Sequence, residues 1–173
     1  MTEGGAIGSF GTTTLTNSTL TGNRIIGTNG DDGGGAIQNT GRIYITGSTF
    51  SGNSSASGAD IHPYYDAANQ PGPPVTTIAS TIVAAGVGGS NCSGSTAVTD
   101  SGYNLDSGSS CGFSSANHSK PSTSAQLGAL ASNGGPTQTM ALPAGSAALD
   151  AGPTTASGCS GTVTSARSPK SAR

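Results

Sequence analysis

The chain has 173 residues, enough for one domain, and only 8% of them are charged, against ~25% in ordinary globular proteins. The formal net charge is −2, and three of the six basic residues lie in the last seven positions. This balance excludes a basic nucleic-acid surface, and the sequence has no apolar stretch long enough for a transmembrane helix. We therefore expect no nucleic-acid partner and no membrane span. Gly, Ser, Thr, Asn and Ala dominate, and the apolar residues are patterned, which favours an all-β repeat over disorder.

Residues 4–23 and 34–53 are two copies of one repeat with a period of 30, and ten of their twenty aligned positions are identical. Both copies begin with Gly-Gly-Ala-Ile and end with Gly-Asn. In the second copy Ile43 and Ile45 are two residues apart, as in a strand, and glycines separate short segments where the chain must turn. Such short strands become stable only when the next copy stacks on them at ~4.8 Å. We therefore predict a parallel β-helix (solenoid) of about three rungs, with three sheets around an apolar column, followed by a C-terminal β segment.

A third, degraded copy begins at residues 58–61. Residues 62–74 then interrupt it with four prolines, and because proline cannot donate to a strand ladder we predict a loop that leaves the stack. Residues 75–82 align with 43–50. The predicted inward stacks are Ile7/Ile37/Ile61, Thr13/Ile43/Val75, Leu15/Ile45/Thr77 and Leu20/Phe50/Ile82, and a predicted side-chain amide ladder joins Asn23 to Asn53.

We divide the chain into repeat rungs (1–88, with the loop 62–74), a C-terminal rung and cap region (89–160), and an unpatterned tail (161–173) that we expect to be disordered. The sequence opens almost directly on a repeat, with no basic n-region or apolar h-region, so we interpret it as a fragment without a signal peptide or anchor of its own. A frame slip near Thr162 would explain the basic tail. An uncapped upper end with open strand edges predicts end-to-end self-association.

Two segments of the second copy are specific. Gly34-Gly-Ala-Ile37 and Phe50-Ser-Gly-Asn53 resemble the GGA-[ILV] and F-x-x-N motifs of chlamydial-type polymorphic outer membrane protein repeats. The first copy keeps Gly4-Gly-Ala-Ile7 but has Leu20-Thr-Gly-Asn23, so that only its Phe departs from the pattern.

The second half of the chain is similar to bacterial β-helix proteins that carry a choice-of-anchor Q domain. The resemblance covers most of residues 4–160 and implies a right-handed parallel β-helix of the pectate-lyase-like superfamily, secreted or on the bacterial cell surface, usually without a known enzymatic role. Relatives of the outer-membrane type act as adhesins. Met140 stands where the family has His, and the family's usual segment after Cys159 is missing. The similar segments are Asn91-Cys-Ser-Gly94, Gly102-Tyr-Asn-Leu-Asp106, Ser110-Cys-Gly-Phe113 and the block 127–152.

Cys92 and Cys111 lie 19 positions apart. Because cystines persist in oxidising compartments, the implied location favours a Cys92–Cys111 disulfide, which would contribute ~3 kcal/mol to stability. The alternative is two free thiols in a cytosolic fragment. Cys159 then has no partner and is expected to be free. The cysteine and histidine spacings give no zinc signature.

Asp31 and Asp32 lie in a Gly-rich segment that resembles one turn of a calcium-binding RTX β-roll, and their carboxylates are suitable calcium ligands. RTX sites need tandem copies, whereas this chain has one. We therefore interpret the segment as a solvated turn and expect no cofactor.

One mixed cluster of functional side chains occurs, on and beside the proline-rich loop: Asp60, His62, Tyr64, Tyr65 and Asp66. A sugar ring would stack on the tyrosines there, and loops that leave a solenoid often carry binding. The alternative is a solvated loop. We expect a non-catalytic, adhesin-like β-helix outside the cytoplasm that binds a glycan or host surface. The runner-up is a fragment of a polysaccharide lyase or hydrolase, which would need acid and base groups on one face.

Overall fold

The computed structural model describes residues 4–26, 33–84 and 86–153. Within these residues the chain is all-β apart from one short 3-10 helix, η1 (Ser115–Asn117). The strands are β1 (Ile7–Ser9), β2 (Thr12–Thr16), β3 (Thr19–Thr21), β4 (Ile37–Asn39), β5 (Arg42–Thr46), β6 (Thr49–Ser51), β7 (Ile61–Pro63), β8 (Val75–Ala79), β9 (Ile82–Ala84), β10 (Val98–Asp100), β11 (Leu105–Asp106), β12 (Leu130–Ala131) and β13 (Thr139–Met140).

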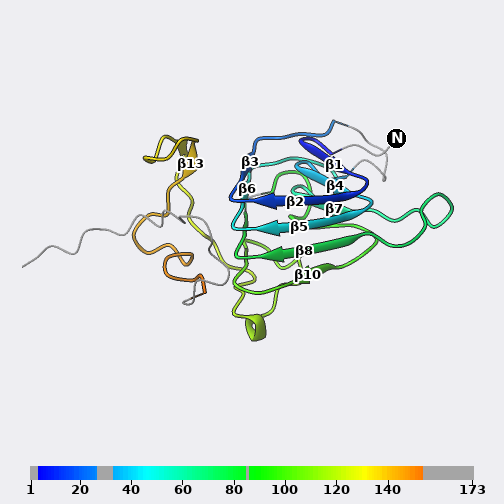
Figure 1. Cartoon of the computed structure of the whole chain (residues 1–173). Helices are drawn as coiled ribbons and strands as arrows, with labels where there is room; N and C mark the ends of the chain where they lie inside the picture. Colours follow the sequence, from blue (N-terminus) through cyan, green and yellow to red (C-terminus); the bar gives the residue numbers. More distant parts are fainter. Residues whose placement is uncertain (1–3, 27–32, 85, 154–173) are drawn as a thin grey trace, which may run out of the picture.

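Eleven of these strands form three stacks of parallel strands, ordered β1-β4-β7, β2-β5-β8-β10 and β3-β6-β9-β11. Figure 1 shows β2, β5, β8 and β10 lying one beneath another. Each of the first three copies contributes one strand to each stack, and Ile7 pairs with Ile37 across the period of 30. The prediction of an all-β chain of short parallel strands stacked copy on copy is confirmed.

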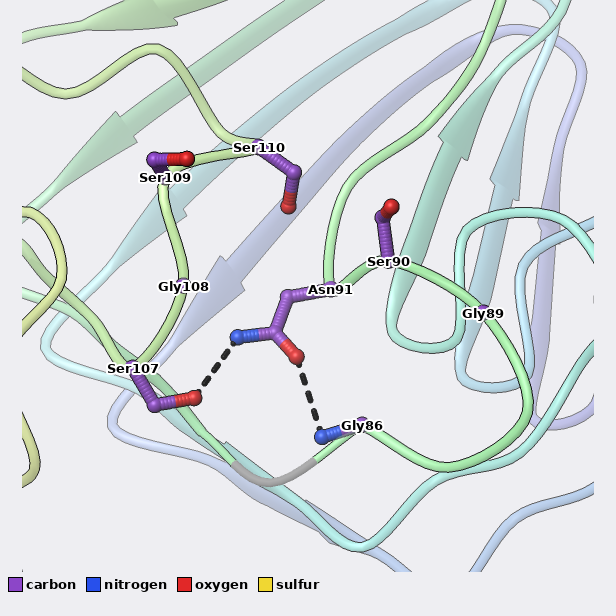
Figure 2. Close-up of a pocket in the computed structure, with 8 residues that line it drawn as sticks. All are labelled: Gly86, Gly89, Ser90, Asn91, Ser107, Gly108, Ser109 and Ser110. Carbon is purple, nitrogen blue, oxygen red and sulfur yellow. Dashed lines mark hydrogen bonds between the residues drawn. The ribbon is translucent and has the colours of Figure 1, made fainter.

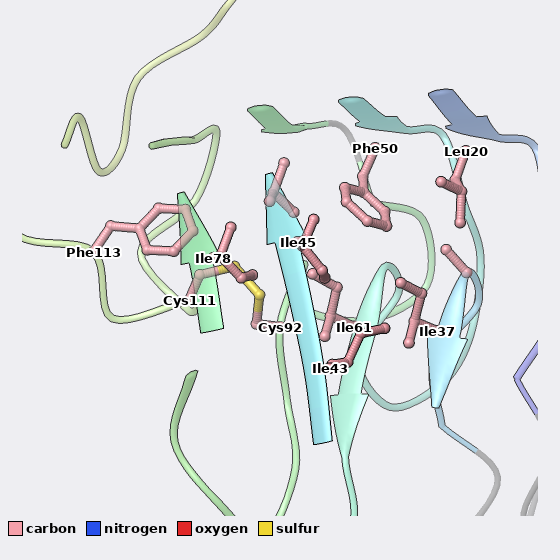
Figure 3. Close-up of a cluster of buried hydrophobic side chains, with 12 residues drawn as sticks. Leu20, Ile37, Ile43, Ile45, Phe50, Ile61, Ile78, Cys92, Cys111 and Phe113 are labelled. Atoms are coloured by element: carbon pink, nitrogen blue, oxygen red, sulfur yellow. A yellow bond between two sulfur atoms is a disulfide. The ribbon is translucent and has the colours of Figure 1, made fainter. Parts of the chain in front are cut away.

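An apolar column fills the space between the stacks, because the strands alternate inward and outward side chains. Phe50, Ile37, Ile43, Ile61 and Ile78 are fully buried within it. Figure 3 shows the column reaching from Leu20 to Phe113 and the disulfide between Cys92 and Cys111. Ile7 and Leu15 of the first copy are only partly buried, because β1, β2 and β3 each end their sheet.

The third copy is shifted by one residue from the predicted register. Ile43 pairs with Thr76, Ile45 with Ile78 and Phe50 with Val83. The predicted partners Val75, Thr77 and Ile82 were therefore wrong, whereas the predicted stack Ile7/Ile37/Ile61 is confirmed. The buried Thr76 hydroxyl accepts a hydrogen bond from Asn39 Nδ2 at 2.9 Å, which satisfies two polar groups inside the stack.

The same corner of each rung has a left-handed backbone. The residue just after the central strand has φ of 48° at Asn17, 60° at Gly47 and 49° at Ser80. At the same corner of the two levels below, φ is 58° at Tyr103 and 60° at His118. Only glycine takes this conformation without cost. Its recurrence at five levels shows that the rung geometry, rather than the residue type, fixes the turn.

A ladder of side-chain oxygens follows this corner. The backbone N–H of Ser18 donates to Ser48 Oγ at 3.2 Å, that of Ser48 to Thr81 Oγ1 at 3.3 Å, that of Thr81 to Asn104 Oδ1 at 3.0 Å and that of Asn104 to Ser119 Oγ at 2.9 Å. A second ladder joins Asn23 Nδ2 to Asn53 Oδ1 at 2.9 Å, as predicted.

The stack continues past residue 88, where the first segment was expected to end. β10 pairs with β8, β11 pairs with β9, and Cys92 makes a parallel bridge with Ile61. A fourth rung is thus built from residues assigned to the C-terminal segment. Beyond it, β12 and β13 form an antiparallel pair, and Figure 1 shows β13 away from the stack.

Lys120 fixes the following segment, because its Nζ donates to the Ala147 carbonyl at 2.7 Å. No helix in the described part of the chain is long and apolar enough to span a membrane. The expected disordered tail 161–173, the frame-slip position Thr162 and Cys159 lie outside the described residues.

Candidate functional site

The predicted cluster on the proline-rich loop is split between the interior and the surface. Asp60 and His62 are 0% and 4% exposed, whereas Tyr64, Tyr65 and Asp66 are half-buried on the excursion. The His62 and Tyr64 rings are stacked with their centroids 6.0 Å apart. Because solvent does not reach Asp60, direct contact of a ligand with its carboxyl has no support in this geometry.

The repeat explains why Asp60 is inside. Asp60 precedes Ile61 as Ala36 precedes Ile37, and Ile61 pairs with Ile37 in parallel register. Ala36 is fully buried at this position. The third copy therefore places a carboxyl group where the second copy places a methyl group.

The Asp60 carboxyl has few hydrogen bonds to replace the water that it loses on burial. Asn53 Nδ2 donates to its Oδ1 at 2.7 Å, and Oδ2 is buried with no hydrogen-bond partner among the described residues. Desolvation by burial raises the pKa of Asp60 to about 7, the Asn53 hydrogen bond acts against this, and the charge of Asp106 adds to it. Asp60 is thus protonated in the folded protein over most of the acidic range.

A second buried carboxyl, Asp106, is well compensated. It pairs with Val83 in β9 and so continues the column of Leu20, Phe50 and Val83. Its Oδ1 accepts from Asn91 Nδ2 at 2.7 Å and from Gly108 N at 2.8 Å, and its Oδ2 accepts from Cys111 N at 3.0 Å. This carboxylate orders the turn after β11, because it provides acceptors for two otherwise unpaired N–H groups.

Asp100 closes the lower end of the stack. It pairs with Ile78, at the end of the column that begins with Leu15. Burial alone would raise its pKa, but hydrogen bonds from Ser114 N, Ser119 Oγ, Asn104 Nδ2 and Gly102 N outweigh burial and hold the pKa of Asp100 below its usual value. These bonds anchor η1 against the last rung.

The outer part of the excursion is an ordered turn. Asp66 Oδ1 accepts from Ala68 N at 3.0 Å, and its Oδ2 accepts from Asn69 Nδ2 at 2.6 Å. The Asn69 hydrogen bond is the main cause of the lowered pKa of Asp66. Tyr65 N donates to Ser95 Oγ at 2.6 Å, which ties the loop to the next rung. Two half-exposed tyrosines beside a carboxylate are thus presented at the surface.

The predicted disulfide is present. Cys92 and Cys111 are bonded with a Cα–Cα separation of 4.8 Å, and both are buried at the end of the apolar column. The bond joins the loop before β10 to the loop after β11. Cys92 N also donates to Ser110 Oγ at 3.0 Å across the same junction.

A polar pocket of about 320 Å³ lies beside this disulfide. Figure 2 shows one wall formed by the segment from Gly86 to Asn91 and the other by the segment from Ser107 to Ser110. The Asn91 side chain lies between the walls, donating from Nδ2 to Ser107 Oγ at 2.9 Å and accepting at Oδ1 from Gly86 N at 3.0 Å.

The calcium candidates Asp31 and Asp32 lie outside the described residues. Among the residues that the structure does describe, no three His, Cys, Asp or Glu side chains come together as metal ligands. The carboxylates of Asp100 and Asp106 are occupied by protein donors.

No protein-family model, curated protein or solved structure matches this chain.

The sequence reasoning missed Asp100, Asp106 and the serine-lined pocket. Asp106 could have been recognised from its spacing. It comes two residues after Asn104, as the inward-facing Leu20 comes two residues after Ser18, so it occupies the corresponding inward position. The signal for the pocket was weaker, because two Gly/Ser segments flank the paired cysteines and only the disulfide brings them together.

Proposed function

We propose that this chain is part of a right-handed parallel β-helix located outside the cytoplasm, which acts as a non-catalytic, adhesin-like surface protein and binds a glycan or host surface. The observation that supports the proposal is the set of three stacks of parallel strands, one of three strands and two of four strands. Such a stack is rigid along its length, and its loops vary without disturbing the core.

The disulfide and the loop support the location and the binding role. A buried cystine between Cys92 and Cys111 is typical of proteins from oxidising compartments. The excursion presents Tyr64 and Tyr65 beside Asp66. Tyr64 N donates to the Asn39 carbonyl and Tyr65 N to Ser95 Oγ, which holds both tyrosines to the scaffold. Aromatic rings next to a polar group on a rigid support are suited to sugar stacking.

The test compares the wild-type protein with a Tyr64→Ala, Tyr65→Ala variant on immobilised glycans and on host cells. We expect the wild type to bind without consuming the ligand, and the variant to lose most of that binding. Tyr44→Ala serves as the control, because Tyr44 is also exposed but lies on β5. Equal binding by all three proteins would contradict a role for the loop.

Incubation with pectin and alginate tests the enzymatic alternative. New reducing or unsaturated ends that disappear in Asp66→Ala would overturn the non-catalytic assignment, since Asp66 is the acidic side chain of the cluster that solvent reaches. Unchanged polymer in both incubations is the expected result.

The upper end of the stack suits self-association. β1, β2 and β3 each have a strand on one side only among the described residues, and open edges pair readily. Sedimentation velocity should show a mass that grows with concentration, and Thr12→Lys with Thr14→Lys on β2 should reduce this growth by charging the edge. A monomer at every concentration would contradict this part of the proposal.

A further inference from the structure

The pocket beside the disulfide has preformed walls. The Cys92–Cys111 disulfide joins the two segments that form the walls, and Cys92 N donates to Ser110 Oγ of the opposite segment at 3.0 Å. The Asn91 side-chain amide lies between the two walls, and its Nδ2 also donates to Asp106 Oδ1 at 2.7 Å. Because the chain is already ordered here, a ligand would bind without ordering a loop.

The rim of this pocket carries unused hydrogen-bonding groups. The hydroxyls of Ser90 and Ser109, both exposed, have no hydrogen-bond partner among the described residues, and neither do their backbone N–H groups. Figure 2 shows these two serines on opposite walls. Each hydroxyl can both donate and accept, so the pair can bind one group from two sides.

The charges around the pocket select against ions. No Lys, Arg, Asp, Glu or His lines it. The nearest carboxyl groups lie behind the walls: Asp106 is bonded to Asn91 and Gly108, and a methyl group built on Gly86 would lie 3.4 Å from Asp60 Oδ2. An anion would find no basic side chain in the lining, and a cation would find no carboxylate there.

The lining also selects against an apolar ligand. It consists of glycines, serines and one asparagine, with no aromatic or aliphatic side chain. A neutral molecule with many hydroxyl groups can use such a surface, because every donor and acceptor finds a partner. The volume of about 320 Å³ is at the lower limit for small-molecule sites and holds one sugar ring.

We propose that this pocket is a binding site for a neutral saccharide unit, with Ser90 and Ser109 as its specificity-determining hydrogen-bond partners. The inference rests on the proposed glycan-binding function for its biological setting, but it places a contact at a second position, away from the tyrosine loop. The ligand class is a neutral hexose or N-acetylhexosamine residue, free or at the end of a glycan.

Ligand-observed saturation-transfer NMR on the full chain tests this proposal, with glucose, galactose and N-acetylglucosamine as probes and with glucuronate, phosphate and calcium chloride as comparators. We expect a saturable signal from at least one neutral sugar that neither anion nor calcium displaces. Ser90→Ala with Ser109→Ala should weaken binding about tenfold or more, since two hydrogen bonds are lost at ~1 kcal/mol each.

Ser93→Ala is the matched control, because Ser93 is exposed next to Cys92 but does not line the pocket. Neither Ser90 nor Ser109 makes a side-chain hydrogen bond within the described structure, so the double variant should unfold at the wild-type temperature. Reduction of the disulfide in the wild type should weaken sugar binding, because the two walls are then released.

Binding of no neutral sugar, displacement by phosphate, or full binding by the double variant would each overturn the inference. If glycan binding is lost in the Tyr64→Ala, Tyr65→Ala variant but retained in the serine variant, the pocket assignment fails while the proposed function stands. Loss in the serine variant alone would place glycan recognition in the pocket rather than on the loop.

Discussion

Asn53 donates a 2.7 Å hydrogen bond from Nδ2 to Asp60 Oδ1 in the interior of the strand stack, and both side chains are completely buried. Asn91 makes the same 2.7 Å contact with Asp106 lower in the stack. The two amide–carboxyl pairs differ in what surrounds them: Asp106 has two further backbone donors, whereas Asp60 has none among the described residues. The pKa of Asp60 is raised to about 7, mainly because burial removes its carboxyl from water.

Asp60→Asn should increase stability at neutral and alkaline pH. Between the ordinary value of 3.8 and about 7 the folded protein retains a proton that the unfolded chain has lost. The free energy of unfolding therefore falls as pH rises through this window, by up to ~4 kcal/mol. Urea denaturation at pH 5 and pH 8 should show this fall in the wild type and little of it in Asp60→Asn, where Asn53 still finds an acceptor. Asp66→Asn, on the surface, is the control, and an equal fall in Asp60→Asn would contradict the assignment.

Asp106→Leu should destabilise the protein although Leu20 occupies the same column. The substitution removes the acceptor for Gly108 N and Cys111 N, and each buried N–H without a partner costs ~1–3 kcal/mol. Asp106→Asn keeps one acceptor oxygen and should lose less. The unfolding temperatures of the two variants give their order of stability. A Leu variant as stable as the wild type would show that these N–H groups bind water instead.

Replacing Cys92 and Cys111 together by serine should lower the free energy of unfolding by ~3 kcal/mol, because the loop between them is no longer closed in the unfolded chain. Denaturant titration under non-reducing conditions measures the difference. A wild type that loses nothing when dithiothreitol is added would contradict a structural role for this bond.

Phe50→Ala should destabilise the stack by ~3–5 kcal/mol, because it leaves a cavity between Leu20 and Val83. Phe10→Ala removes the same atoms from a side chain that is 66% exposed and should cost under ~1 kcal/mol. Circular dichroism melts of both variants provide the measurement. Similar losses would mean that Phe10 is covered by another part of the protein.

Much of the fold could be predicted from the sequence, because the motif that opens each copy fixes which residues meet. Ile7, Ile37 and Ile61 align without ambiguity, because each is the last residue of the Gly-Gly-Ala-Ile motif or of its variant Gly-Ala-Asp-Ile. The third copy was misplaced by one residue because Val75–Ile82 and Thr76–Val83 have the same spacing of inward positions. The turn decides between them: Ser80 takes the left-handed corner and Thr81 then supplies the ladder oxygen.

The candidate site was harder to predict, for a different reason. Asp60 was assigned to the loop because of its polar neighbours, although its alignment with Ala36 already indicated burial. Repeat position outweighs residue type here, since the backbone of each rung follows the rung above. The serine pocket depends on a contact between residues 86–91 and 107–110 that no local pattern encodes.

The ladder through Ser18, Ser48, Thr81, Asn104 and Ser119 makes the addition of repeats during evolution easier. Every member except Ser119 donates a hydrogen bond from its backbone N–H to the level below, and every member except Ser18 accepts one from the level above. The requirement at this position is therefore only a short side chain with an oxygen, and serine, threonine and asparagine all meet it. A duplicated 30-residue unit inserted at this point would find both neighbours already compatible, so the length of the protein can evolve separately from its recognition surfaces.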